Sequence, residues 1–355
     1  LGVDGQLGYG SPHDVGNDEL PKTAGDVPLG GAASQIVAGR DHTCALLGSG
    51  KVRCWGRGLW GQLGYGNSQN IGDGEPASAG GDVALGAAAV ELAAGWYHTC
   101  ARLSTGSVRC WGYGAVGQLG LAETQGVGDD ELPVSKPVIA LGASAAHISA
   151  GLFHTCVRTT AGGVRCFGYG ESGRLGYANL QTIGDDEHPL IAGDVSVGGS
   201  VTQIALGTAH SCALTTAGKV VCWGDASQGQ LGAGNTHDIG DDETPSGVAA
   251  LTLAALDECA LKIDGCSLDA TCFDQPVGYT CACNVGFKGD GVTCTPLGAH
   301  VTDVVAGGSH TCALLSTGAV RCFGLGSSGQ LGYGNTQSIG DDEQPHVAGT
   351  SRSAA

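Results

Sequence analysis

Short segments of alternating apolar and polar residues recur along the chain, and each is bounded by glycine. One set reads VTQIAL (201–206), SCALT (211–215) and KVVCW (219–223). Alternation with a period of two predicts strands that are half buried. The last two segments are separated by a three-residue loop that ends in Gly218, and such loops usually end in the left-handed conformation that glycine adopts readily. The pattern therefore predicts a strand followed by a hairpin.

This unit recurs with a period of 56 residues, as the spacing from His42 to His98 shows. The fifth copy, at His310, follows the fourth, at His210, after 100 residues, which is 44 more than the period. The phrase G-[QR]-L-G keeps the same spacing through the chain. A fixed period of this length predicts a propeller or a solenoid, and the excess predicts one insertion.

The repeated motif G-x-x-H-[TS]-C-A-L-x-x-x-G-x-V-x-C-W-G, followed by G-Q-L-G, resembles the regulator of chromosome condensation repeat. The resemblance covers the chain except for residues near 254–296. It implies an all-β fold, a β-propeller of four-stranded blades that commonly number seven. Removing the 44 extra residues from the 355 of the chain leaves about 5.5 periods. We therefore expect a fragment of a six- or seven-bladed ring whose remaining part lies upstream.

The interruption at 257–294 carries six cysteines and resembles an epidermal growth factor-like module in its C-x-C and G-F-x-G-D-G-x-x-C motifs. A module of under about 40 residues cannot bury enough apolar surface alone, so disulfides must hold it. The two resemblances divide the chain into propeller repeats (1–253), the module (257–294) and further repeats (297–355). The family's pairing implies the disulfides Cys259–Cys272, Cys266–Cys281 and Cys283–Cys294.

The module also resembles the calcium-binding subtype, whose entry motif is D-x-[DN]-E-C with Asp or Asn two residues after the third cysteine. Glu258 and Asp274 match ligand positions, and Leu256 and Asp257 belong to the entry segment. Ala255 replaces the first acidic ligand. Because calcium takes six to eight oxygen ligands, this loss weakens the site. Two alternatives stay open: a weakened calcium site, and a disulfide-held module without an ion.

Each repeat carries two cysteines ten positions apart. Counting outward from the hairpin loop places Cys312 opposite Cys322 on a non-hydrogen-bonded pair, where Cα atoms lie about 4.5 Å apart. Disulfides tolerate about 4.4–6.8 Å, so we favour bridges over two alternatives, buried thiols and a zinc set completed by His310. The expected bridges are Cys44–Cys54, Cys100–Cys110, Cys156–Cys166, Cys212–Cys222 and Cys312–Cys322.

One histidine per repeat, two residues before the first cysteine, suggests an architectural role. A ligand or a general base seldom needs five identical copies, so we expect a structural hydrogen bond inside each blade. These histidines are His42, His98, His154, His210 and His310.

Charge and cysteine content narrow the class of partner and the compartment. The formal net charge is −18 and no basic run occurs, whereas nucleic-acid binding needs clustered Lys and Arg. The longest apolar run, Val248–Leu256, is far shorter than the roughly 20 residues that span a bilayer. Sixteen cysteines, an even number, and the inserted module predict an extracytoplasmic protein, secreted or at the cell surface.

An acidic turn of the form GDDE recurs once per repeat, for example at 128–131 and 184–187. Repeated Gly-Asp turns bind calcium in the nonapeptide β-helix repeats, but no G-G-x-G-x-D pattern is present here. We favour solvated turns of an acidic protein over calcium sites.

No G-x-S-x-G or H-E-x-x-H motif occurs, and a functional site should stand out as single-copy residues on the repeated background. Such residues are Trp60, Trp96, Tyr97 and Phe153, together with the inserted module. We expect a non-catalytic binding scaffold for an extracellular protein or glycan. The alternatives are a secreted enzyme with its active site in the central funnel and, from the family archetype, a guanine-nucleotide exchange factor.

Overall fold

In the part of the chain that the computed structural model describes, the repeats form five three-stranded antiparallel sheets. The structure describes residues 2–15, 17, 20–248, 251, 273–274, 279–280, 301–341 and 344–345. In chain order, the strands of the five sheets are β1 (Ala33–Ala38), β2 (His42–Leu47), β3 (Val52–Gly56); β4 (Ala89–Ala94), β5 (His98–Leu103), β6 (Val108–Gly112); β7 (Ala145–Ala150), β8 (His154–Thr159), β9 (Val164–Gly168); β10 (Val201–Leu206), β11 (His210–Thr215), β12 (Val220–Gly224); and β15 (Val301–Ala306), β16 (His310–Leu315), β17 (Val320–Gly324).

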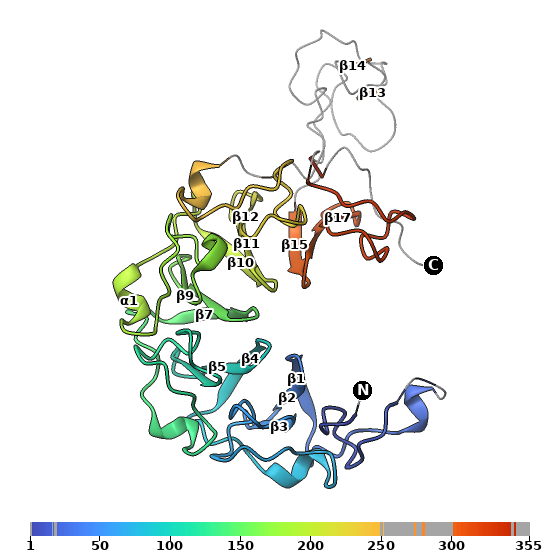
Figure 1. Cartoon of the computed structure of the whole chain (residues 1–355), viewed down its shortest axis with the longest axis vertical. Helices are drawn as coiled ribbons and strands as arrows, with labels where there is room; N and C mark the ends of the chain where they lie inside the picture. The colour runs from blue at the N-terminus through green and yellow to red at the C-terminus, as the bar shows by residue number, and fades with distance from the viewer. Residues whose placement is uncertain are drawn as a thin grey trace, which may run out of the picture.

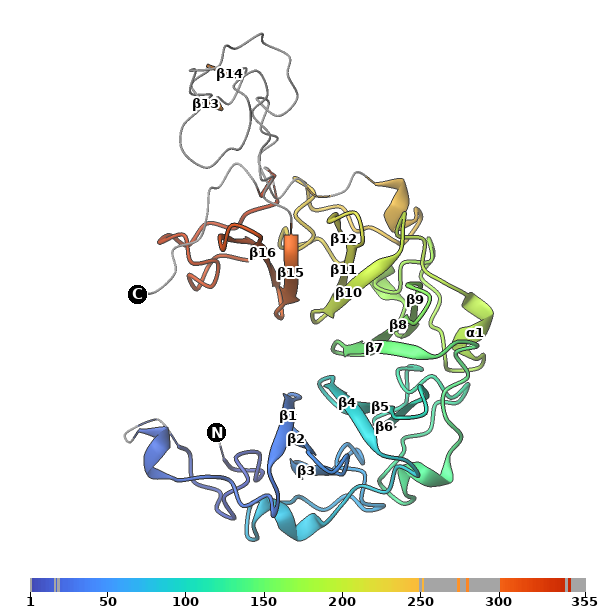
Figure 2. The same ribbon diagram turned by 180° about the vertical axis from the view of Figure 1, so that it is seen from behind.

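The sheets stand like blades around a common centre. Figures 1 and 2 show the first strands of the sheets, β1, β4, β7, β10 and β15, nearest to that centre, and consecutive first strands contact one another. In the part of the chain that the structure describes, the blades form an open arc with the first and fifth sheets at its two ends. The all-β propeller architecture that the repeat resemblance implies is confirmed.

The blades are joined by segments with little regular structure. Short helices lie in these connections: η1 (Pro21–Thr23), η2 (Ala77–Gly80), η3 (Pro133–Ser135), η4 (Glu171–Gly173), α1 (Pro189–Ala192) and η5 (Pro245–Gly247). Within the inserted module, two short strands, β13 (Phe273–Asp274) and β14 (Tyr279–Thr280), pair in an antiparallel manner.

The prediction of four strands per blade is not confirmed, because the position of a fourth strand holds a single bridged residue. In the first blade, the Gly56 N–H donates to the Ile71 carbonyl at 2.7 Å and the Ile71 N–H donates back to Gly56 at 3.0 Å. Gly72 follows with φ of 101°, a conformation that turns the chain away from the sheet and favours glycine. The same bridge occurs once in each of the other four blades.

Each hairpin is closed by a disulfide between its directly opposed cysteines. Cys44 pairs with Cys54 in the strand register and is bonded to it, with a Cα–Cα distance of 4.1 Å. Leu47 N–H donates to Lys51 O beside the loop, so alternation leaves the cysteines on a non-hydrogen-bonded pair. The other four hairpins contain the corresponding bridges, Cys100–Cys110, Cys156–Cys166, Cys212–Cys222 and Cys312–Cys322.

The blade core lies around these bridges. Cys44, Cys54 and the ring that follows the second cysteine are almost fully excluded from solvent. Burying a large aromatic ring removes much apolar surface from water, which stabilises the blades and their packing on the neighbouring segments. The rings in question are Trp55, Trp111, Phe167, Trp223 and Phe323.

Candidate binding face

The turns that join the first and second strands of the blades meet at the centre of the arc. Their glycines line one cavity of about 280 Å³, with Arg40 and Trp96 beside them. Glycine is needed in each turn because the backbone packs closely: a Cβ on Gly39 would lie 2.1 Å from the His42 ring and 2.5 Å from the Gly95 carbonyl oxygen. The glycines are Gly39, Gly95, Gly151, Gly207 and Gly307.

The two residues that follow each of these glycines distinguish the blades from one another. In the first three blades they are large: Arg40–Asp41, Trp96–Tyr97 and Leu152–Phe153. In the last two they are small, Thr208–Ala209 and Gly308–Ser309. The repeat scaffold is therefore preserved throughout, while the surface chemistry of this face changes halfway around the arc.

The large residues form one connected cluster of rings. Trp60 packs edge-on against Tyr113 with centroids 5.2 Å apart, and Tyr113 lies 5.9 Å from Phe153. Tyr97 stacks on Phe153 at 5.8 Å and meets Trp96 edge-on at 6.4 Å. We call these five residues together with Arg40 the aromatic strip. It runs from Trp60, beyond the end of β3, to Trp96 at the central cavity.

A cation completes the central end of the strip. The Arg40 guanidinium lies 5.3 Å from the centroid of Trp96 and 5.7 Å from that of Tyr97, and it donates a hydrogen bond to the Tyr97 hydroxyl. Cation–π contacts of this kind hold a guanidinium in place without neutralising it. Trp60 and Trp96 remain 42% and 37% exposed, and large exposed aromatic residues mark interaction sites.

Four of the repeat histidines bond to the next blade and not within their own, which corrects the expected location of their hydrogen bonds. His42 Nε2 lies 2.9 Å from Thr99 Oγ1 on the next blade. Because the Thr99 hydroxyl donates to the Gln62 carbonyl at 3.0 Å, it accepts from His42, which therefore carries its proton on Nε2. The same pairs recur as His98–Thr155, His154–Ser211 and His210–Thr311.

The four that bond across blades, His42, His98, His154 and His210, are neutral parts of the architecture. Burial lowers the pKa of His42 to about 4 and, together with the charge of His42, that of His98 to about 3. Both rings are almost fully excluded from solvent, so a substrate cannot reach them. The zinc alternative fails as well, because the cysteines beside them are bonded to each other.

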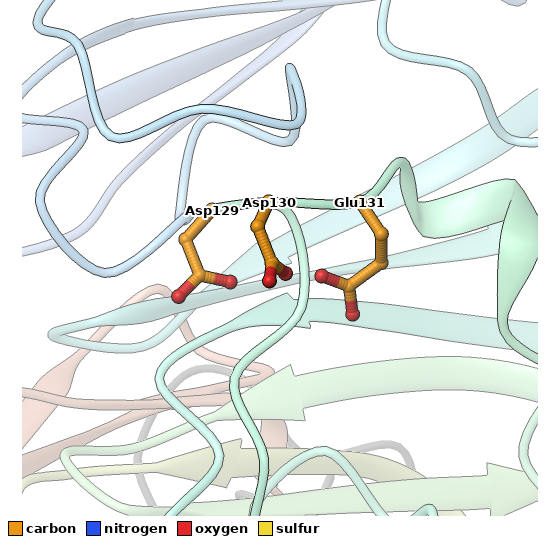
Figure 3. A group of neighbouring side chains, drawn as sticks. All are labelled: Asp129, Asp130 and Glu131. Carbon is orange, nitrogen blue, oxygen red and sulfur yellow. The ribbon is translucent and has the colours of Figure 1, made fainter.

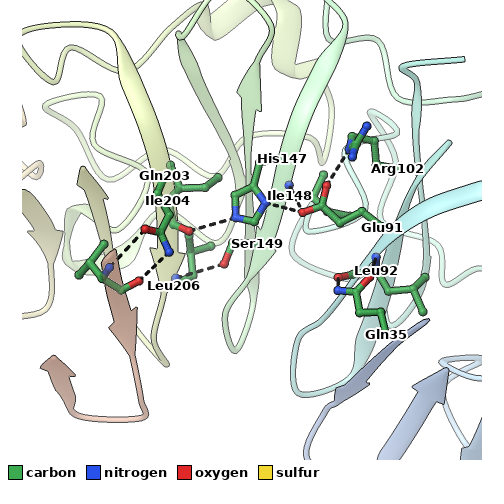
Figure 4. Close-up of polar contacts among 11 residues, drawn as sticks. Gln35, Glu91, Leu92, Arg102, His147, Ile148, Ser149, Gln203, Ile204 and Leu206 are labelled. Carbon is green, nitrogen blue, oxygen red and sulfur yellow. Dashed lines mark hydrogen bonds and ion pairs between the residues drawn. The ribbon is translucent and has the colours of Figure 1, made fainter. Parts of the chain in front are cut away.

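A second set of contacts links the first strands of neighbouring blades (Figure 4). The Gln35 side chain acts as a strand partner for the next blade: its Nε2 donates to Leu92 O at 2.9 Å and its Oε1 accepts from Leu92 N–H at 2.8 Å. Gln203 makes the same pair of bonds to Val304. These amide clamps fix the blade spacing around the centre.

The corresponding positions in the second and third blades hold an ion pair in place of an amide. Glu91 Oε1 pairs with His147 Nδ1, and Glu91 Oε2 accepts from Arg102 Nε at 2.6 Å. His147 Nε2 faces the Ile204 carbonyl at 3.3 Å, so each ring nitrogen of His147 lies beside an oxygen atom of a neighbouring blade. Burial alone would raise the pKa of Glu91, but hydrogen bonds from His147 and Arg102 outweigh it and lower that pKa.

The acidic turns bring three carboxylates together. Figure 3 shows Asp129, Asp130 and Glu131 side by side, with ligand atoms within 4.8 Å of one another. The equivalent residues of the third and fourth blades, Asp185–Glu187 and Asp241–Glu243, are arranged in the same way. Burial and the neighbouring Asp130 raise the pKa of Glu131 to about 7. That these are solvated turns and not calcium sites stays a prediction.

The other predicted calcium ligands, Leu256, Asp257 and Glu258, lie outside the described residues, as do the three disulfides expected within the module. Asp274 falls in β13, of which only the backbone pairing is described. The calcium prediction for the module therefore stays a prediction.

Comparison with known proteins agrees with the repeat pattern. A family model described as the Regulator of chromosome condensation (RCC1) repeat matches residues 33–62, 89–118, 145–174, 201–230 and 301–330. The chain is 30% identical over 352 residues to the ultraviolet-B receptor UVR8 of Arabidopsis thaliana, a match that covers 94% of this chain and 74% of UVR8. The chain belongs to the family of regulator of chromosome condensation repeat proteins. An EGF domain model matches residues 259–294 of this RCC1-repeat protein.

Other members of the family share the repeats within larger or differently built proteins. The probable E3 ubiquitin-protein ligase HERC3 of Homo sapiens is 32% identical over 209 residues, which cover 58% of this chain and 19% of HERC3. Among solved structures, human WBSCR16 superposes with a TM-score of 0.54 at 16% identity, covering 90% of this chain and 83% of that one.

Prp20p of Saccharomyces cerevisiae superposes with a TM-score of 0.53 at 21% identity, covering 97% of this chain and 84% of that one. At these identities the likeness shows the propeller fold alone. Prp20p itself binds Gsp1p and histones. None of the helices that the structure describes combines the length and hydrophobicity needed to cross a membrane.

Sequence reasoning identified four of the six residues of the aromatic strip, namely Trp60, Trp96, Tyr97 and Phe153. It missed Tyr113 and Arg40. Aligning the repeats gives a signal for Arg40, which occupies the place of Trp96, but none for Tyr113, because Tyr169 fills the same place in the next repeat.

Proposed function

We propose that this RCC1-repeat protein is a non-catalytic binding scaffold that recognises a partner protein through the aromatic strip. The observation that carries the proposal is the asymmetry of the face. The turn residues are Trp96–Tyr97 in one blade and Gly308–Ser309 in another, although the scaffold beneath them is the same.

The composition of the strip supports a protein ligand. Trp, Tyr and Arg dominate the binding energy of protein interfaces, where a few such residues account for most of the affinity. The strip supplies two tryptophans, two tyrosines and one arginine on adjoining blades. Rings that already pack against one another lose little conformational entropy when a partner binds.

The central cavity supports a non-catalytic role. The described residues around it are mainly Gly and Ala, with Arg40 as the single charged side chain among them. General acid–base catalysis needs a titratable group within hydrogen-bond reach of the substrate. Buried, neutral His98 and its counterparts cannot provide one.

The extracytoplasmic location is part of the same proposal. It is supported by the five hairpin disulfides and by the match of residues 259–294 to an EGF domain. Disulfides on this scale form and persist in oxidising compartments.

A pull-down from culture medium tests the proposal. The baits are the unaltered chain, a Trp60→Ala/Trp96→Ala variant, and an Ile191→Ala control, which removes a side chain that is 73% exposed away from the strip. We expect the unaltered chain and the Ile191→Ala control to retain the same proteins from the medium. The Trp60→Ala/Trp96→Ala variant should lose them. Equal retention by all three baits, or turnover of a peptide or polysaccharide panel, would contradict the proposal. A parallel experiment with a calcium chelator shows whether an ion is required.

A further inference from the structure

The packing of the aromatic strip limits the kind of ligand that it accepts. Tyr97 and Phe153 present their faces to each other, with an interplanar angle of 25°. Arg40 lies over the face of Trp96. A sugar ring stacks its C–H groups on an open aromatic face, whereas the stacked faces of Tyr97 and Phe153 and the face of Trp96 under Arg40 are already covered. Such a surface fits the irregular side chains of a protein segment.

The charge of the strip limits the ligand further. Asp41 lies near two guanidinium groups, 3.8 Å from Arg40 Nε and 3.9 Å from Arg57 Nη1. One carboxylate beside two arginines leaves this corner positive, on a chain whose formal net charge is −18. Arg40 and Arg57 are 52% and 40% exposed, so an approaching carboxylate can reach both. The remaining acidic surface repels anions, which directs them toward this corner.

The size of the adjoining cavity agrees with a single inserted side chain. Its volume of about 280 Å³ lies below the roughly 300–1,000 Å³ of sites that enclose a small-molecule ligand. Arg40 and Trp96 stand at its edge together with the turn glycines. A carboxylate placed there can accept from the guanidinium while its methylene groups contact Trp96.

We propose that the strip docks an acidic segment of the partner protein, with Arg40 as the residue that binds its carboxylate. Apolar side chains next to that carboxylate pack along Tyr113 and Trp60, beside exposed Leu59. This inference rests on the proposed function and adds to it the chemistry of the partner. Arginine suits the role because its planar fork pairs with a carboxylate through two parallel hydrogen bonds.

A displayed library of random linear peptides, selected on the immobilised chain, provides the test. The inference predicts that the enriched peptides share Asp or Glu next to an aromatic or aliphatic residue. A synthetic peptide from the selection is then titrated against variants of the chain. We expect its Kd to weaken by about tenfold or more for Trp96→Ala, the scale of an interface hot spot, and by a similar factor for Arg40→Gln. High salt should weaken binding as well.

Two substitutions serve as matched controls. Lys219→Gln makes the same change in net charge as Arg40→Gln, at an exposed residue beside the β11–β12 hairpin loop, at the opposite end of β11 from His210. Ile191→Ala removes an exposed apolar side chain elsewhere. Both should leave the Kd unchanged. Thermal unfolding of each variant confirms that the altered side chains, all exposed, do not disturb the fold.

Failure of the inference differs from failure of the proposed function. Peptides that need Trp96 but neither Arg40 nor an acidic residue overturn the inference alone. A library that yields no peptide dependent on the strip overturns both. Two further results also overturn the inference. The first is a dimer of the chain, seen in sedimentation equilibrium, that Trp96→Ala abolishes. The second is retention of polygalacturonate that depends on Arg40, when the library yields no acidic peptide.

Discussion

His42 and Thr99 lie on adjacent blades, and the 2.9 Å contact between Nε2 and Oγ1 ties one blade to the next. The Thr99 hydroxyl donates a hydrogen bond to the Gln62 carbonyl, which also accepts one from Trp111 Nε1 at 3.0 Å. One buried relay thus joins a histidine, a hydroxyl and the G-Q-L-G loop. Its repetition around the arc gives the face that carries the aromatic strip a rigid support.

Removing one member of the relay should destabilise the chain. His98 is fully buried and lies 2.8 Å from Thr155 Oγ1. For His98→Ala we expect the free energy of unfolding to fall by about 2–4 kcal/mol, since a cavity forms and a buried hydroxyl loses its donor. Urea denaturation measures the change. Thr155→Ser is the matched control, because Ser211 fills the same place in the next blade, and it should cost under about 1 kcal/mol. Equal losses for the two variants would contradict the relay.

The same histidine predicts a pH dependence. The pKa of folded His98 is lowered to about 3, so between pH 6.5 and 3 the unfolded chain binds a proton that the folded chain does not. The contribution of neutral His98 to the free energy of unfolding is therefore complete above about pH 6.5 and is lost as the pH falls. The difference in unfolding free energy between the unaltered chain and His98→Gln should shrink from pH 7.5 to pH 4.5. A constant or growing difference would mean that the ring is charged in the folded state.

The acidic turns predict a dependence of the opposite sign. Burial, the hydrogen bond that protonated Glu187 donates to Asp186, and the nearby carboxylates raise the pKa of Glu187 to about 7. The free energy of unfolding therefore falls as the pH rises from about 4.5 through 7, because the folded chain must ionise Glu187 in surroundings that disfavour its charge. In EDTA at pH 8, Glu187→Gln should raise the free energy of unfolding by about 0.5 kcal/mol, the scale of partly exposed charges. Glu123→Gln, which removes the 2.6 Å contact to Lys136, should not raise it.

The ion pair between the second and third blades should be replaceable by the amide that other blades use. Glu91→Gln alone leaves His147 and Arg102 without their carboxylate, and we expect it to cost about 1–3 kcal/mol of unfolding free energy. The double change Glu91→Gln/His147→Gln restores the residue found at Gln35 and Gln203, and should recover part of that loss. Chemical denaturation of the single and double variants tests this. A double variant no more stable than Glu91→Gln alone would contradict the equivalence of the two clamps.

What the sequence predicts well is local. The hairpin loop sets the register of β2 and β3, and the register places Cys44 opposite Cys54, so strand pairing and disulfide follow from a dozen residues. The partner of His42 lies 57 residues on and becomes its neighbour only when blades pack, so local pattern could not place that bond between blades. The aromatic strip could be predicted from the sequence only in part. Its single-copy rings stand out in sequence, but Arg40 joins Trp96 through contact across two repeats.

Hydrogen–deuterium exchange of the unaltered chain, with and without a captured partner protein, tests whether the aromatic strip is the surface that binds the partner. We predict that binding slows exchange in the peptides containing residues 39–41, 57–60, 95–97 and 113. Exchange in the equivalent turns at 207–209 and 307–309 should stay unchanged. Protection of the last two blades, or of the outer acidic turns, without protection of the strip would contradict it.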